Sequence, residues 1–167
     1  MKPGDHPDFF RLPPPPGRSR ESTIVLDAEG RFWHDGALVR HPGMARAFAS
    51  WIARHPDDDR YILTNGYDWT YLRVEDTPHF VTRIDFAAAP PMLELLDGTR
   101  EPLVPESIEV RPDGALTVAV KEGKFRARLT RDALLGLEPR LNSAPDGAVY
   151  LELDGRRWPL RVPRPEA

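Results

Sequence analysis

The sequence contains no cysteine, which excludes a disulfide, a thiol nucleophile and a cysteine-ligated zinc site. It also lacks any run of about 18 apolar residues, the length that a membrane-spanning helix requires. The N-terminus, MKPGDHPDFF, has no apolar stretch of the kind found in a signal peptide. From these features we expect no membrane partner and a cytoplasmic location.

The common phosphate-binding loops, GxxxxGK[ST] and GxGxxG, are missing, so ATP or NAD chemistry of the usual kinds is not expected. The five histidines are scattered and show neither HxxxH nor HExxH spacing, and we therefore predict no metal site. No cofactor is expected. The net charge is only −3, so the chain does not have the bulk electrostatics of a nucleic-acid-binding protein.

What the chain does contain is a proline-rich start followed by many short apolar stretches. Residues 1–22 include the run PPPP, which favours an extended N-terminal arm. Beyond the arm, alternating apolar residues are separated by Asp-Gly and Asn-Gly turns, as is typical of antiparallel hairpins. In two places the apolar spacing changes to about 3.6 residues and predicts a helix. The first helix is expected from Pro42 to His55, and the second contains Leu134.

The two halves of the chain share one order of expected elements. Three anchor residues recur at a constant offset of 89 positions, namely Tyr61, Gly66 and Trp69 as Tyr150, Gly155 and Trp158. We therefore predict an α+β protein of two tandem β-rich repeats, each with antiparallel strands and one packed helix. Independent reuse of hairpin turns is the alternative. The expected parts are an arm at 1–22, a first repeat at 23–76, a bridging β segment at 77–106, a second repeat at 107–162 and a tail at 163–167.

The segment KEGKFRARLTR has the most distinctive polar pattern. Apolar and basic residues alternate in it, so in a strand the basic side chains project together from the face opposite the core. A small anionic ligand or an acidic protein surface would neutralise them. The alternative is pairing with the chain's own acids, such as Glu152 and Asp154. The candidate ligand-binding residues are Lys121, Lys124, Arg126, Arg128 and Arg131.

A second cluster offers a catalytic alternative. Glu75, Asp76 and His79 place two carboxylates and an imidazole within five residues, which could provide the acid and base of a small hydrolase or lyase. A turn set by Pro78, in which the Asp76 side chain bonds backbone amides, explains the same residues without catalysis. Because no nucleophile is placed beside them, the sequence favours a non-enzymatic ligand-sensing or protein-interaction module. A structural adaptor that forms a homodimer through exposed sheet edges is a further alternative.

The sequence also resembles a known family. The stretches LPPPP, IVLDAEGRFWHDGALVRHPGMARAFASWIAR and YILTNGYDWTYLRVEDTPHFV, with VKEGKFRARLTRDALLGL in the second half, are similar to the uncharacterised bacterial domain-of-unknown-function family 1285. The resemblance covers most of residues 12–162 and implies a mixed α and β fold with repeated motifs. It also implies a role in signal transduction or ligand sensing, with no assigned activity and no catalytic residues. TNGYDW and LDGTREPLV depart from the family pattern, so no ligand is carried over.

Overall fold

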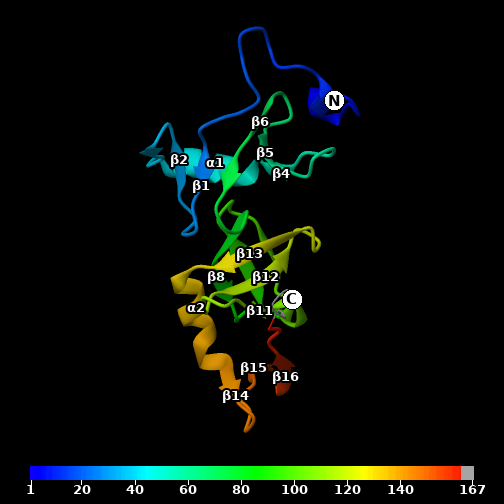
Figure 1. Ribbon diagram of the computed structural model, residues 1–167. Coiled ribbons are helices and arrows are strands. Elements are labelled where there is room, and N and C mark those ends of the chain that lie inside the picture. The colour runs from blue at the N-terminus through cyan, green and yellow to red at the C-terminus, as the bar shows by residue number, and fades with distance from the viewer. Residues whose placement is uncertain (163–167) are drawn as a thin grey trace. The chain divides into compact units, whose positions relative to one another are not determined.

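The structure is a computed structural model that describes residues 1–162, and the predicted tail at 163–167 lies outside them. The fold is mixed α and β, with mostly β-strands and two α-helices among the described residues. The chain forms two compact units, the first from Met1 to Pro78 and the second beginning at His79. Each unit has its own small sheets and its own helix (Figure 1).

The first unit contains two sheets and helix α1. Its elements are β1 (Val25–Leu26), β2 (Phe32–His34), β3 (Ala37–Leu38), α1 (Pro42–Ser50), β4 (Ile52–Arg54), β5 (Tyr61–Thr64), β6 (Trp69–Tyr71) and β7 (Arg73–Val74), preceded by the 3₁₀ turns η1 (Pro3–Asp5) and η2 (Phe9–Arg11). One sheet has the order β3-β2-β1-β7, in which only β1 and β7 are parallel. The other is an antiparallel meander, β4-β5-β6.

Helix α1 begins at Pro42 as predicted, but its predicted end at His55 is wrong. The backbone N–H of Trp51 closes the last turn on the carbonyls of Ala47 and Phe48, and the chain then extends into β4. There Ile52 pairs with Leu63 of β5, so its buried side chain contributes to a sheet face instead of a helix face. A buried apolar residue is compatible with both the helical and the strand spacing, which explains why the helix was predicted to continue through Ile52.

The N-terminal arm packs onto the β4-β5-β6 sheet. Phe9 is only 6% exposed and clusters with Ile62 and Trp69. The backbone N–H of Gly4 donates to the Gly66 carbonyl at 2.7 Å. Farther along, the Arg11 guanidinium donates to both carboxylate oxygens of Asp57, at 3.1 and 2.7 Å. The arm is therefore part of the packed structure of the first unit.

The second unit contains a six-stranded sheet, a three-stranded sheet and helix α2. Its elements are β8 (His79–Asp85), β9 (Met92–Leu95), β10 (Arg100–Pro102), η3 (Pro105–Ser107), β11 (Glu109–Val110), β12 (Leu116–Val120), β13 (Phe125–Leu129), α2 (Arg131–Leu137), η4 (Glu138–Arg140), β14 (Leu141–Ser143), β15 (Val149–Leu153) and β16 (Arg156–Pro159). The large sheet has the order β10-β9-β8-β13-β12-β11, with β8 and β13 parallel. The smaller sheet is the meander β14-β15-β16.

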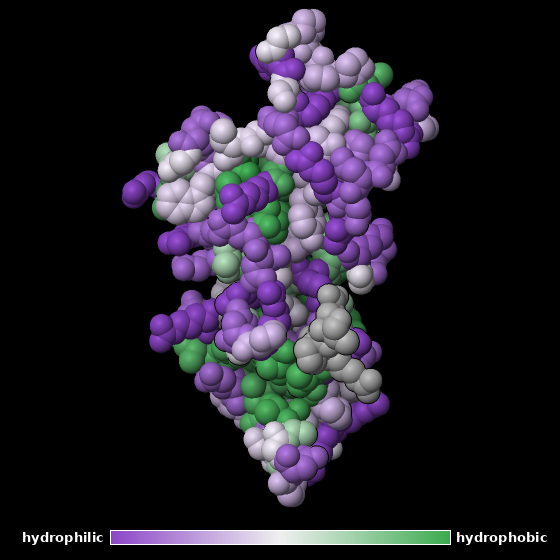
Figure 2. All heavy atoms as spheres, in the orientation of Figure 1, coloured by the Kyte–Doolittle hydropathy of each residue, from purple (hydrophilic) through white to green (hydrophobic). Residues whose placement is uncertain are grey.

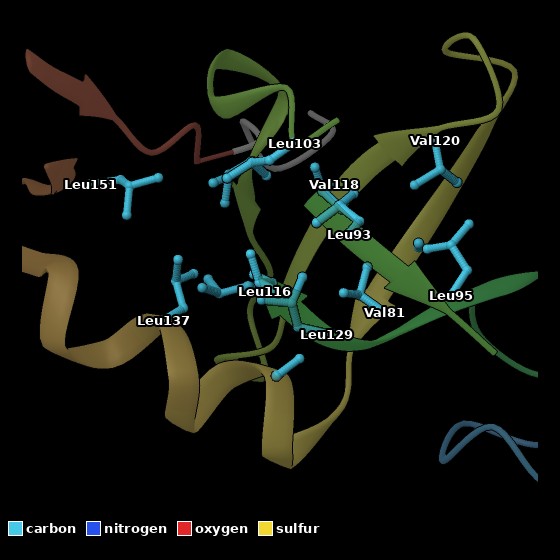
Figure 3. Close-up of a cluster of buried hydrophobic side chains, with 14 of the residues drawn as sticks. Val81, Leu93, Leu95, Leu103, Leu116, Val118, Val120, Leu129, Leu137 and Leu151 are labelled. Atoms are coloured by element: carbon cyan, nitrogen blue, oxygen red, sulfur yellow. The ribbon is translucent and has the colours of Figure 1, made fainter. Parts of the chain in front are cut away.

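The core of the second unit joins strands from two of the predicted segments. Side chains of β8, β9, β12 and β13 gather in one cluster with Leu137 of α2 and Leu151 of β15 (Figure 3). Strand β8 lies in the middle of the large sheet. The strands of the predicted bridging segment at 77–106 therefore lie in the same sheet as β11, β12 and β13 of the predicted second repeat.

Both units contain a run of three strands, one helix and three strands, which is β1–β6 with α1 in the first and β11–β16 with α2 in the second; β7 and β8–β10 lie outside this shared run. The strand register, however, does not follow one constant offset. Ile62 lies opposite Tyr71, whereas Leu151 lies opposite Trp158, because residues 65–68 connect β5 to β6 and only residues 154–155 connect β15 to β16. The tandem repeat therefore stays a prediction.

The visible surface is mainly hydrophilic, with apolar patches between the polar residues of each unit (Figure 2). No helix within residues 1–162 is long and apolar enough to cross a membrane.

Candidate functional site

The predicted basic strand is β13, and its alternation is as expected. Ala127 and Leu129 are buried in the core of the second unit, so Arg126 and Arg128 lie on the opposite face of the strand. Their cross-strand neighbours on β12 are Ala119 and Thr117.

Arg126 is partly buried and is held mainly by neutral groups. Its Nη2 donates to the Ser107 carbonyl at 2.8 Å and to Thr117 Oγ1 at 2.9 Å. The nearest carboxylate oxygen, from Glu109, is 3.6 Å away. Burial lowers the pKa of the Arg126 guanidinium, Glu109 acts against this, and the like charge of Arg161 adds to it. Its Nε is buried and has no hydrogen-bond partner among the described residues.

The other predicted cations are dispersed. Arg128 pairs with Asp113 at 3.3 Å, and Lys124 lies 3.9 Å from Glu122, with both of the latter side chains largely exposed. Arg131 is an exposed residue at the start of α2. The structure therefore places Arg126 and Arg128 on one strand face and does not gather all five residues into one site.

Lys121 is turned toward the connection between β9 and β10. Its Nζ donates to Asp97 Oδ2 at 2.7 Å and to Thr99 Oγ1 at 2.9 Å. Asp97 is only 8% exposed. Burial alone would raise the pKa of its carboxyl, but the hydrogen bonds from Lys121 and Thr99 outweigh burial and hold the pKa below its ordinary value.

The turn between β12 and β13 has an unusual backbone. Lys121, Glu122 and Gly123 have φ angles of 53°, 59° and 78°. Only glycine adopts this left-handed region without a steric penalty, which is about 1–2 kcal/mol for other residues. The backbone N–H of Lys124 donates to the Lys121 carbonyl at 3.1 Å and closes the turn.

A depression of about 600 Å³ lies beside this turn. It reaches from β10 to the end of β12, although these strands are not neighbours in the sheet. They come together because the sheet curls, as the hydrogen bond from the Lys121 backbone N–H to the Glu101 carboxylate shows. Its walls are formed by Glu101, Pro102, Val104, Ala119, Lys121, Glu122 and Gly123.

The predicted catalytic residues are divided between the two units. Glu75 and Asp76 follow β7 of the first unit, whereas His79 begins β8 of the second. His79 is 5% exposed and packs edge-on against Phe125, with ring centroids 5.0 Å apart. Burial lowers its pKa to about 4; the positive charge of Lys121 adds to this, while Asp97 opposes it. The imidazole is therefore neutral at neutral pH.

The sequence analysis did not identify the acidic residues that lie beside Arg126 and Arg128. Acids of the chain itself lie beside both arginines, as the alternative interpretation expected, but they are Glu109 and Asp113 in place of the suggested Glu152 and Asp154. The Glu152 carboxylate instead accepts a hydrogen bond from Asn142. No local pattern identifies Glu109 and Asp113 as partners, because the pairing of β11 with β12 brings them to the arginines.

The architecture defines the chain as an α+β protein of two compact units. Solved structures with this fold include a DUF1285 family protein from Silicibacter pomeroyi DSS-3, with a TM-score of 0.64 and 20% identity over 96% of this chain and 90% of that chain. Another is a DUF1285 family protein from Shewanella baltica OS155, with a TM-score of 0.58 and 20% identity over 74% of this chain and 96% of that chain. No protein-family model and no curated protein matches the chain. The resemblance to DUF1285 is thus confirmed at the level of the fold.

Proposed function

We propose that this protein is a non-enzymatic ligand-sensing or protein-interaction module of bacterial signal transduction. In this proposal the second unit binds a small anion, or an acidic protein surface, at the face of β13 that carries Arg126 and Arg128. The observation that carries the proposal is that Arg126 donates to two neutral acceptors, the Ser107 carbonyl and Thr117 Oγ1, while the Glu109 carboxylate stays 3.6 Å away.

An anion would improve the bonding of this guanidinium. The Arg126 side chain is 33% exposed, and its neutral acceptors leave the positive charge without a close counter-ion. A phosphate or carboxylate oxygen is a suitable acceptor, because the planar arginine side chain presents several N–H groups to it. The nearest internal carboxylate, Glu109, lies at 3.6 Å and is a weak competitor. The Arg128–Asp113 pair has a partly exposed carboxylate, so exchanging it for a ligand oxygen loses little energy.

The alternative of a hydrolase or lyase has less support. Its base would be His79, whose lowered pKa of about 4 makes the imidazole a weak proton acceptor at neutral pH. Its two carboxylates come from the other unit. A homodimeric adaptor is the third candidate, and an association state of two in solution would favour it.

We also propose that the two units descend from one duplicated motif. The shared order of three strands, a helix and three strands supports this. The unequal connections at 65–68 and 154–155 would then be later changes of loop length.

The anion proposal is tested by thermal unfolding with orthophosphate, nucleotides and organic acids. A ligand present at 100 times its Kd stabilises the folded state by about 2.7 kcal/mol, which raises Tm by several degrees in a domain of this size. We expect the shift to disappear in Arg126→Gln/Arg128→Gln. The matched control is Arg157→Gln, an exposed arginine on β16, which should keep it. A shift that persists in the double variant would contradict the site.

A further inference from the structure

The depression beside the β12–β13 turn has a different chemistry from the basic strand. Pro102, Val104 and Ala119 give it apolar walls. Its volume of about 600 Å³ falls within the range of small-molecule sites, roughly 300–1,000 Å³. The depression adjoins the anion face proposed above, because Ala119 in its wall lies opposite Arg126, but neither Arg126 nor Arg128 lines it.

The depression lies between the edge strand β10 and the end of β12 that extends beyond its short partner β11, and side chains cap this open edge of β12. The backbone N–H of Ala119 donates to Ser107 Oγ at 3.1 Å. The backbone N–H of Lys121 donates to both carboxylate oxygens of Glu101, at 3.0 and 3.2 Å. The outward donors of this edge are therefore already satisfied, and a ligand that brings only acceptors finds few partners here.

The remaining polar groups of the depression are acceptors. Glu101 and Glu122 contribute carboxylates. The N–H of Ala119 points away from β13, and in an antiparallel ladder the carbonyl of the same residue points the same way. Among the described residues of the wall the cation is Lys121, which is engaged by Asp97 and Thr99.

The charged side chains that line the depression also favour a positively charged ligand. Two carboxylates, on Glu101 and Glu122, line it against one ammonium group, on Lys121, which is itself paired with Asp97. The Arg126 guanidinium on the neighbouring strand is directed to Ser107 and Thr117.

We propose that the depression binds an organic cation, namely an alkylammonium or alkylguanidinium group. Its N–H donors contact the Glu101 and Glu122 carboxylates, and its short aliphatic chain lies against Pro102 and Val104. A free amine and the lysine or arginine side chain of a partner protein present this same chemistry.

The first test is an NMR titration of the full chain with pentylammonium and with pentanoate, which have similar chains and opposite charges. We expect saturable shifts of the backbone amides in 101–104 and 119–123 with pentylammonium and none with pentanoate. Equal responses to the two probes, or shifts confined to other residues, would overturn the proposal. An anion site at Arg126 and Arg128 would instead respond to pentanoate, so the two proposals fail independently.

The second test uses charge-removing variants at the rim. Glu122→Gln and Glu101→Gln should each weaken pentylammonium binding about tenfold, the change expected when one charged hydrogen bond is lost. Glu122 is exposed, so its variant keeps the fold even if Glu101→Gln disturbs the Lys121 backbone contact. Glu138→Gln, an exposed carboxylate on η4, is the control and should bind normally. Unchanged affinity in Glu122→Gln would contradict the site.

A final pair of probes separates the two sources of the cation. Agmatine represents a free guanidinium, and a short peptide with a central arginine represents a protein side chain. Peptide binding about tenfold tighter than that of agmatine would support a protein partner, and the opposite order would support a free amine. Binding of neither probe would overturn the proposal.

Discussion

His79 illustrates what one buried side chain does to this protein. Its imidazole is enclosed in the second unit against Phe125, and its pKa is lowered from 6.5 to about 4 by burial first and by the charge of Lys121 second. The folded state therefore disfavours the protonated form, whereas the unfolded chain binds a proton at the ordinary pKa.

From this we predict that the free energy of unfolding decreases as the pH is lowered through a defined window. Between pH 6.5 and 4 the unfolded state binds more protons at this position, so stability is complete above pH 6.5 and decreases as the pH falls toward 4. The full loss is about 3 kcal/mol, because one pKa unit corresponds to about 1.4 kcal/mol. Urea unfolding of the protein at several pH values between 7 and 4 measures it.

The variant His79→Gln should remove this part of the pH dependence. His34→Gln changes an exposed imidazole in the first unit and serves as the control, which should unfold with the slope of the unchanged protein. Equal slopes in the His79 variant and the unchanged protein would show that burial does not control this titration.

Individual residues of the site could be predicted only in part. The alternation around Arg126 and Arg128 was sufficient to place them on one face of a strand. Their partners could not be predicted, because Glu109 and Asp113 approach them through β11 and its turn, whose position depends on sheet pairing. Lys121 is a similar case, since Asp97 reaches it only because the sheet curls.

At the scale of the element, the β12–β13 turn has a backbone conformation that suits asparagine followed by glycine, but it has glutamate at the first of these positions. Both central positions, Glu122 and Gly123, have positive φ, and asparagine followed by glycine suits such a turn well. We predict that Glu122→Asn raises the free energy of unfolding by about 1 kcal/mol, because asparagine tolerates the left-handed region better than glutamate. Thermal or urea unfolding checks the change.

The control for this prediction lies in the same turn. Lys124 is not among the residues with positive φ, so Lys124→Asn should give no such gain. A loss of stability in Glu122→Asn would mean that the glutamate side chain contributes more than its backbone strain removes.

Most elements could be predicted where the spacing of apolar residues and the turn residues beside them indicated the same element. Strand β13 has the alternation predicted for KEGKFRARLTR, and Gly123 lies in the turn that joins it to β12. The sequence misassigned β4, because its few residues follow a true helix and continue the helical spacing of apolar residues. Only the pairing of β4 with β5 decides its conformation, and that contact lies beyond a local pattern.

At the scale of the whole molecule, the two units have separate apolar clusters. The larger one contains Val118 and Leu137 of the second unit, and another contains Phe9 and Trp69 of the first. We predict that Leu137→Ala, which removes a fully buried side chain, destabilises the second unit by about 2–5 kcal/mol. Amide hydrogen exchange in β8, β12 and β13 should accelerate accordingly, with β5 and β6 less affected.

The matched variant is Phe9→Ala, for which the reverse pattern is expected. Exchange in β5 and β6 should accelerate, and that in β12 and β13 should change less. Equal acceleration in both units after either substitution would show that they unfold as one cooperative body.

The fold class followed from the sequence because hairpin turns and two helical stretches are local signals. The joining of the bridging segment at 77–106 to the sheet of the second repeat did not, because β8 enters that sheet through its parallel pairing with β13, about fifty positions later in the chain. A parallel pair leaves no turn motif in the sequence.

The packing of the N-terminal arm also has a consequence for folding during synthesis. The arm is the first part of the chain to be synthesised, yet its contacts reach Asp57, 46 residues after Arg11, and Trp69 of the same cluster as Phe9. During synthesis Phe9 must therefore wait for most of its unit to emerge before it is buried. The segment that is made first can therefore be buried only after its partners at positions 57–69 have been made.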